Sequence, residues 1–292
     1  MASEPLLISD LLYEYATRIW NRIRYSRIRN LSISETILTE NFLFDFWYQA
    51  RRDHLPVEIY EAKTQKRDEN AVEIYLETNR GYLLMACQAK LINKFNKYPS
   101  VRYKVKNEYQ IDLLLRYGER MGGLAFYLFY NYTDDHELIE KLEKSGKYKH
   151  SHFGLTVCNA ELIKNAFFGG KRPRLLNPRN LKIPRLKDLH PLYAFPLPEW
   201  IRILTNENVI DILKEISNPV DTKFKFYSKD EITGNYSWEP FLPASNISRV
   251  NTRKEGSSLY KKTLISSGFK PKYRIVLPLS SKQRVGNLYP VL

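Results

Sequence analysis

Two neighbouring stretches decide the fold: Ala71-Val72-Glu73-Ile74-Tyr75-Leu76-Glu77 and Tyr82-Leu83-Leu84-Met85-Ala86-Cys87-Gln88-Ala89-Lys90-Leu91-Ile92. The turn-forming cluster Thr78-Asn79-Arg80-Gly81 separates them. Both stretches have the composition of strands, and the second is apolar enough to lie in the centre of a sheet. The sequence therefore predicts an antiparallel hairpin over residues 71–92.

Helical patterns surround this hairpin in the chain. Apolar residues recur at helical spacing over 6–28 and 35–50 before it, and over 107–121 after it. Residues 124–130, all of them apolar or aromatic, predict a further strand that is buried on both faces. The remaining expected elements are helices over 137–144, 159–168 and 206–217 and strands over 56–60, 152–157, 224–227 and 273–277. This order of elements predicts an α/β fold.

Composition excludes several classes of protein. The chain of 292 residues has two cysteines, Cys87 and Cys158, which cannot build a disulfide framework or a four-thiolate zinc site. It has no run of about eighteen uncharged apolar residues that could cross a membrane, and its N-terminus lacks the basic start and apolar core of a signal peptide. We therefore expect a protein of the reducing cytoplasm with no membrane partner.

Positive charge is concentrated in the C-terminal part of the chain. Residues 160–292 hold 23 Lys and Arg against 11 Asp and Glu, whereas residues 1–159 hold 23 against 21. A segregated excess of this kind indicates a surface that faces a polyanion such as nucleic acid. A solvated basic face without a partner is the alternative.

The densest part of this excess is residues 171–187, which we call the basic strap. It contains three prolines and no acidic residue, so we expect an extended chain that contacts the phosphate backbone of nucleic acid. Its cations are Lys171, Arg172, Arg174, Arg179, Lys182, Arg185 and Lys187. Alternatively, the strap packs across the core and its charges are merely solvated.

Gln88 and Lys90 are the main candidates for chemistry. Lys90 lies near the end of an apolar strand, where an ammonium without a partner is costly. Because side chains alternate along a strand, Gln88 and Lys90 share one face, and an in-register hairpin brings Glu73 or Glu77 toward it. The structural alternative is a Gln/Lys pair at a strand end, with Glu73 as the salt-bridge partner of Lys90.

The chemistry of this group suits a metal-dependent reaction on a phosphate. Carboxylate and amide oxygens are hard ligands that fit Mg²⁺, and Mn²⁺ is expected to substitute for it. Such an ion polarises a phosphate and activates a bound water. A neighbouring lysine can orient that water and stabilise the developing charge.

Other motifs are weaker. A rival acid-x-lysine triplet, Glu61-Ala62-Lys63, is followed by a stretch too polar for a central strand. His150 and His152 would face the same way on a strand, but a zinc site needs two further ligands. The sequence has neither the glycine-rich loop of nucleotide hydrolases nor that of dinucleotide-binding proteins.

The order of these elements resembles that of the PD-(D/E)xK nuclease superfamily, in the variant whose second acid is glutamine. The sequence also resembles a family of bacterial proteins with the motifs E-T-x-x-T-E, G-A-D and Q-A-K, a glutamine that opens a helix, and a strand ending in F-Y-N. The corresponding residues here are Glu35-Thr36-Ile37-Leu38-Thr39-Glu40, Ala71-Val72-Glu73, Gln88-Ala89-Lys90, Gln110 and Phe126-Tyr127-Leu128-Phe129-Tyr130-Asn131. The resemblance covers about residues 10–200.

This resemblance implies a restriction-endonuclease-like mixed sheet flanked by helices, with an irregular basic C-terminal extension. Together with the shift to a basic, proline-containing composition at residue 171, it divides the chain into a nuclease core, residues 1–170, and an extension, residues 171–292. It implies metal-dependent hydrolysis of phosphodiester bonds, with DNA as the favoured substrate and bacterial anti-phage defence as the setting. A homodimer or a partner protein from a defence system would then be a further partner.

The resemblance also implies a role for each motif residue. Glu35 would be the helix acid, Glu73 the principal metal ligand, Gln88 the second ligand and Lys90 the base that orients water or an electrostatic stabiliser, with Glu77 as an extra ligand. The aspartate of G-A-D is Glu73 here, and this departure supports a second hypothesis, a non-catalytic nucleic-acid-binding protein with a degenerate nuclease core. A third is a structural or regulatory subunit whose basic surface contacts an acidic protein.

Overall fold

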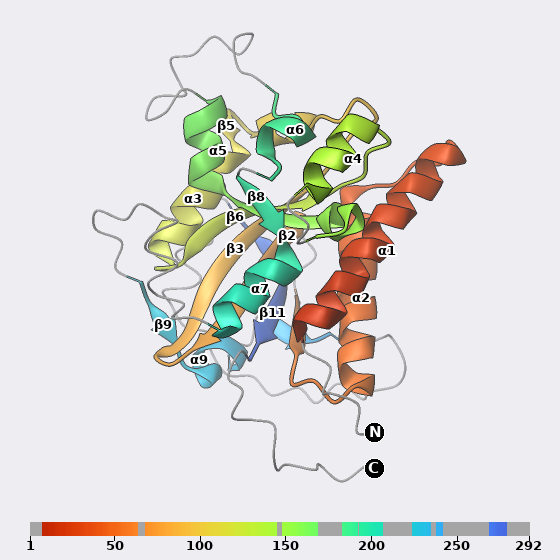
Figure 1. Ribbon diagram of the computed structural model, residues 1–292. Helices are drawn as coiled ribbons and strands as arrows, with labels where there is room; N and C mark the ends of the chain where they lie inside the picture. Colours follow the sequence, from red (N-terminus) through yellow and green to blue (C-terminus); the bar gives the residue numbers. More distant parts are fainter. Residues whose placement is uncertain are drawn as a thin grey trace, which may run out of the picture.

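A computed structural model of the chain describes residues 8–63, 68–144, 148–168, 183–191, 193–206, 224–234, 238–241 and 269–278, of which 68, 69 and 202–206 are described by their backbone alone. Nine strands of these residues form one sheet, in the order β10-β1-β11-β2-β3-β6-β7-β8, with β9 also paired to β3. Figure 1 shows helices on both sides of this sheet. The expected fold class, a mixed sheet flanked by helices, is confirmed.

The central hairpin is formed as predicted. Strands β2 (Asp68–Thr78) and β3 (Gly81–Leu91) pair in antiparallel fashion, with Ala71 opposite Gln88 and Glu73 opposite Ala86. Gly81, at the turn between them, has a φ of +121°, which a residue with a side chain rarely adopts. This register determines which side chains share a face of the sheet.

Parallel neighbours enclose the hairpin. On one side, β6 (Leu124–Tyr130) runs parallel to β3, and β7 (Leu155–Asn159) and β8 (Ala194–Pro196) continue the sheet. On the other side, β11 (Pro271–Leu277) runs parallel to β2, followed by β1 (Glu58–Ala62) and β10 (Trp238–Pro240). Four strands from beyond residue 170, namely β8, β9 (Phe226–Tyr227), β10 and β11, thus belong to the same sheet as the hairpin.

Two layers of helices cover the sheet. Helices α1 (Ile8–Ile28), α2 (Glu35–Arg52) and α7 (Leu197–Asn206) belong to one face, on the right and front in Figure 1. Helices α3 (Gln110–Arg120) and α5 (Ala160–Phe167) belong to the other, on the left. Each layer buries its own apolar cluster against the sheet, so the residues on β2 and β3 alternate between two cores.

Short elements at the edge of the sheet complete the described chain. They are η1 (Pro99–Arg102), β4 (Lys104–Val105), β5 (Glu108–Tyr109), α4 (His136–Glu143), η2 (His150–Gly154), α6 (Leu186–Leu189) and α9 (Lys229–Thr233). Most of the expected helix over 206–217 lies outside the described residues. Among the described residues, no helix is long and apolar enough to cross a membrane.

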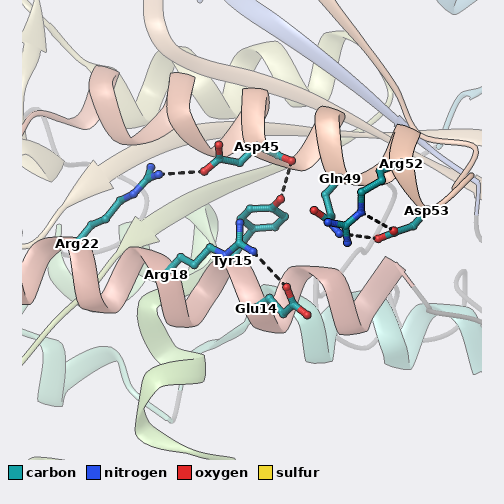
Figure 2. A network of polar contacts seen from close by, with 8 residues as sticks. All are labelled: Glu14, Tyr15, Arg18, Arg22, Asp45, Gln49, Arg52 and Asp53. Carbon is teal, nitrogen blue, oxygen red and sulfur yellow. Dashed lines mark hydrogen bonds and ion pairs between the residues drawn. The ribbon is translucent and has the colours of Figure 1, made fainter.

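A polar seam joins the first two helices (Figure 2). The hydroxyl of Tyr15 on α1 donates to the backbone oxygen of Asp45 on α2 at 2.6 Å, and Arg22 pairs with the Asp45 carboxylate at 3.0 Å. Burial raises the pKa of Tyr15 to about 12, so its hydroxyl remains a donor. Arg18, one turn before Arg22, pairs with Glu14 at 3.4 Å. Arg18 and Arg22 therefore have intramolecular partners.

Candidate active site

The residues singled out by sequence converge on one face of the hairpin. Glu73 and Gln88 are fully buried and Lys90 is 2% exposed. The register places the three side chains on the face that α3 covers, with Glu73 diagonal to Gln88. The prediction that they share a sheet face is confirmed. The carboxylate of Glu73 has strong partners, whereas the amide of Gln88 has none among the described residues.

Both oxygens of the Glu73 carboxylate have strong partners. Tyr117 on α3 donates its hydroxyl to Oε1, in a short hydrogen bond. Arg274 on β11 contacts Oε2 through Nε at 2.7 Å and through a terminal nitrogen at 2.6 Å. The structural alternative paired Glu73 with Lys90. In the structure, the counter-charge of Glu73 comes instead from Arg274.

Arg274 is the main residue that sequence reasoning missed. It lies directly opposite Glu73 in the parallel pairing of β11 with β2, and it is 1% exposed. Its guanidinium lies 4.2 Å from the ring centroid of Trp238 and donates to the backbone oxygen of Ile232. The available signal was an arginine inside the apolar run Tyr273–Leu277, which needs a partner for the same reason as Lys90.

Gln88, in contrast, is buried without a hydrogen-bond partner in the described part of the chain. Neither its amide nitrogen nor its amide oxygen is satisfied by any described residue, although the side chain is fully enclosed. The residue beside it on β6, Tyr127, is also fully buried, and its hydroxyl has no partner among the described residues. Burial is the main cause that raises the pKa of Tyr127 far above its ordinary value, so this hydroxyl is protonated. Three unsatisfied polar atoms thus lie on neighbouring strands.

Lys90 is held at the edge of this unsatisfied group. Its ammonium donates to the amide oxygen of Gln110 at 2.7 Å, and Nζ lies 6.0 Å from the ring centroid of Tyr127. Gln110 is the first residue of α3, so the helix that covers the site also positions its lysine. The side chain of Lys90 on β3 is therefore held in place by Gln110 on α3, twenty residues further along the chain.

Glu35 reaches the same end of β3 from the other helical layer. It opens α2, where Ser34 caps the helix by accepting from the backbone nitrogen of Ile37 at 3.2 Å. Its Oε1 accepts from the backbone nitrogen of Leu91 at 2.9 Å and from the hydroxyl of Ser100 at 2.7 Å. The structure therefore brings Glu35 beside the strand end that carries Lys90.

Glu77 and the rival triplet lie elsewhere. Glu77 is opposite Tyr82, six residues along β2 from the position opposite Gln88, which corresponds to about 20 Å of strand. It is therefore too far from Gln88 to bind the same ion. Glu61 lies on β1, where Oε1 is 3.7 Å from Nζ of Lys272, and Lys63 is exposed. Neither belongs to the group around Gln88.

Gln88 and Glu73 differ in how well they suit Mg²⁺ as ligands. The unsatisfied amide oxygen of Gln88 and the carboxylate of Glu35 at the same strand end have the chemistry of hard-ion ligands. The Glu73 carboxylate has the same chemistry, but its charge is already balanced by Arg274. Among the described residues, no group of three or more His, Cys, Asp or Glu side chains is arranged to hold a metal. Gln88 thus fits such an ion, whereas Glu73 fits it only without Arg274.

The structure describes part of the basic strap and both residues of the histidine pair. Of the strap's cations, Lys171, Arg172, Arg174, Arg179 and Lys182 lie outside the described residues. Arg185 and Lys187 are exposed, and Lys187 belongs to the short helix α6, which the expectation of an extended chain did not include. His150 pairs with Glu143 at 2.6 Å, and the ring of His152 lies 4.5 Å from that of Tyr13. The two histidines therefore have separate, non-metal contacts.

The chain belongs to a family of unknown function, DUF6615, whose model matches residues 8–255. The match includes every candidate residue described above except Arg274. Comparisons with curated proteins and with solved structures gave no match.

Proposed function

We propose that this protein is a metal-dependent nuclease that hydrolyses phosphodiester bonds of nucleic acid, with DNA as the favoured substrate. The observation that supports it best is the unsatisfied Gln88 amide, fully buried on the same sheet face as Lys90 and Glu73. A buried amide without partners costs free energy, and a bound ion is one of the ways in which proteins satisfy such a group.

The proposal gives each described residue a task. Mg²⁺ held by Gln88, with Glu73 as a second ligand once Arg274 is displaced, would polarise the scissile phosphate and lower the pKa of a water. Lys90, fixed by Gln110, would stabilise the charge that develops on the phosphate oxygens. Glu35 would hold the end of β3 through the backbone nitrogen of Leu91 and so keep Lys90 in place.

A second candidate function is a nucleic-acid-binding protein without catalysis. Two observations favour it: the buried pair of Glu73 and Arg274, and the nearly complete burial of Lys90. A carboxylate that is neutralised by an internal arginine attracts a cation less strongly than a free one. Under this candidate, Glu73 is a structural residue and the basic surface alone carries the function.

The setting and partners are part of the same proposal. The resemblance to the PD-(D/E)xK nuclease superfamily supports a role in bacterial defence and a cytoplasmic location, and a homodimer or a second defence protein would be the protein partner. The cations of the basic strap would contact the substrate backbone without regard to its sequence.

The deciding experiment is a cleavage assay on plasmid, linear duplex, single-stranded DNA and RNA, with Mg²⁺, Mn²⁺ or EDTA. We expect cleavage with either metal and none with EDTA. Lys90→Met removes the charge but keeps the length of the side chain, and it should lower the rate by at least about 100-fold while binding is retained. Glu73→Ala should also abolish cleavage, but it leaves Arg274 buried without its partner, so its folding must be checked.

The control is Glu61→Ala with Lys63→Ala, the rival triplet on and beside β1, for which we expect a small effect. Full cleavage by the Lys90→Met protein would rule out the assignment of the site. Absence of cleavage of every substrate with both metals, together with retained binding, would favour the second candidate.

A further inference from the structure

The segment that follows β3, residues 92–107, has an unusual composition. It contains five Lys and Arg residues and no Asp or Glu. It also carries two of the most exposed aromatic side chains of the described chain, Phe95 at 67% and Tyr103 at 58%. This basic and aromatic segment begins two residues after Lys90, so it lies beside the candidate site by chain connectivity alone.

The inner side of this segment contacts the candidate site. The hydroxyl of Ser100 donates to Oε1 of Glu35 at 2.7 Å, and the backbone oxygen of Tyr103 accepts from the backbone nitrogen of Gln110 at 2.9 Å. Gln110 in turn accepts from Lys90. The segment is therefore attached to both residues that flank the end of β3.

The N-terminal part of the segment is also fixed in place. The backbone oxygen of Asn93 accepts from the guanidinium of Arg27 at 2.7 Å, and its side chain accepts from the backbone nitrogens of Phe95 and Lys97 at 2.9 and 3.0 Å. The backbone of Lys97 pairs with that of Arg185, at the described end of the basic strap. Figure 1 shows α6, which begins after Arg185, at this edge of the sheet.

Exposed side chains on this anchored backbone face the solvent. Lys94, Lys104 and Lys106 are exposed together with Phe95 and Tyr103. Exposed aromatic rings beside cations are the combination by which proteins bind unpaired strands of nucleic acid. A backbone that is already ordered loses little further entropy when a ligand binds.

We propose that residues 92–107 form a binding surface for an unpaired strand of nucleic acid, with Phe95 and Tyr103 stacking on bases and the lysines contacting phosphates. Stacking on an exposed ring requires a base whose face is free, which a duplex does not offer. Exposed lysines beside the rings match the backbone charge of the same strand. This inference deepens the proposed function, because it names the strand that the site would receive.

The test is a binding titration of a fluorescent oligothymidylate and of a duplex of the same length, both in EDTA. We expect Phe95→Ala with Tyr103→Ala to weaken single-strand binding by about tenfold or more and duplex binding by less than about threefold. Lys94→Ser with Lys104→Ser should flatten the log–log salt dependence of single-strand binding by about 1.4, at about 0.7 per cation.

Matched controls come from α2. Phe44 and Tyr48 are 41% and 57% exposed, and Tyr48 lies thirteen residues beyond Glu35, about 20 Å along the helix from the site end. Phe44→Ala with Tyr48→Ala should leave single-strand binding unchanged, and Arg51→Ser with Arg52→Ser should leave the salt dependence unchanged.

Unaltered single-strand binding by the Phe95→Ala, Tyr103→Ala protein would overturn the inference, and so would an equal loss on the duplex. Because the titration contains no divalent metal, it is independent of catalysis. Failure of the proposed nuclease function would instead be seen in the cleavage assay, with this binding intact.

Discussion

Glu73 and Gln88 lie diagonally on neighbouring strands, are equally buried, and meet opposite surroundings. The Glu73 carboxylate has a hydroxyl and a guanidinium on its two oxygens, whereas the Gln88 amide has no partner among the described residues. A charge inside a protein is tolerated only when it is paired. A neutral amide can remain unsatisfied at a smaller cost. Burial alone therefore does not distinguish a structural residue from one that awaits a ligand, but the state of its hydrogen bonds does.

The largest effect on the free energy of unfolding should come from breaking the pair of Glu73 and Arg274. Arg274→Met removes the counter-charge and leaves the Glu73 carboxylate buried, so we expect a loss of about 3 to 5 kcal/mol in the free energy of unfolding. Urea unfolding measures it. Adding Glu73→Gln to Arg274→Met removes the buried charge and should restore most of the loss. A single variant within about 1 kcal/mol of the wild type would show that the pair contributes little.

His190 is a second buried polar side chain with hydrogen-bond partners. It tests whether such a group also resists protonation when the pH falls. Its Nε2 lies 2.8 Å from the hydroxyl of Thr156 and its Nδ1 lies 3.0 Å from the backbone oxygen of Leu186. Because a carbonyl oxygen only accepts, Nδ1 carries the proton and Nε2 accepts from Thr156. Burial lowers the pKa of His190 from 6.5 to about 4.

The pH dependence follows from that direction. Between pH 6.5 and 4 the unfolded chain binds a proton that the folded chain refuses, so stability falls as the pH falls through this window and is complete above it. The loss should be on the order of 3 kcal/mol. Urea unfolding from pH 7 to 4 measures it, and His190→Gln, which cannot titrate, should show a flatter dependence. Equal slopes for both proteins would contradict the shift.

The sequence predicts which residues share a face of the sheet better than it predicts the partners of those residues. Period-two alternation was enough to place Glu73, Gln88 and Lys90 on one face, because the turn at residues 78–81 leaves little freedom of register. The partners come from far away: Arg274 is 201 residues from Glu73, and Gln110 is twenty residues from Lys90. No local pattern specifies that β11 inserts between β1 and β2. Candidate residues can thus be found from spacing, but their state of pairing cannot.

Substitution of Gln88 should change the free energy of unfolding in the opposite direction. Gln88→Leu replaces a buried amide, which has no partner among the residues that the structure describes, by an apolar side chain of similar size. We therefore expect the free energy of unfolding in metal-free buffer to rise by about 1 to 3 kcal/mol. Tyr127→Phe, which removes only the unsatisfied hydroxyl, should act in the same direction. Urea unfolding in EDTA is the measurement.

The matched control for Gln88 is the same substitution at Gln110. Its amide oxygen accepts from Lys90, so Gln110→Leu removes a partner from a buried ammonium and should destabilise the protein. If Gln88→Leu were to destabilise the protein as much as Gln110→Leu does, Gln88 would have a partner in the free protein, and the contrast with Glu73 would disappear.

The smallest effect is expected for an arginine whose pair is exposed. Arg18 and Glu14 are one helical turn apart on α1, at 3.4 Å, and about half of each side chain is in water (Figure 2). Water and salt screen such a pair, and holding two long side chains in place costs entropy. Arg18→Ala should therefore change the free energy of unfolding by no more than about 0.5 kcal/mol, an order of magnitude less than Arg274→Met. Urea unfolding of both variants in one buffer compares them directly. If Arg18→Ala were as harmful as Arg274→Met, the energetic difference between the two arginines would not lie in burial, and the physical basis of the contrast between Glu73 and Gln88 would have to be sought elsewhere.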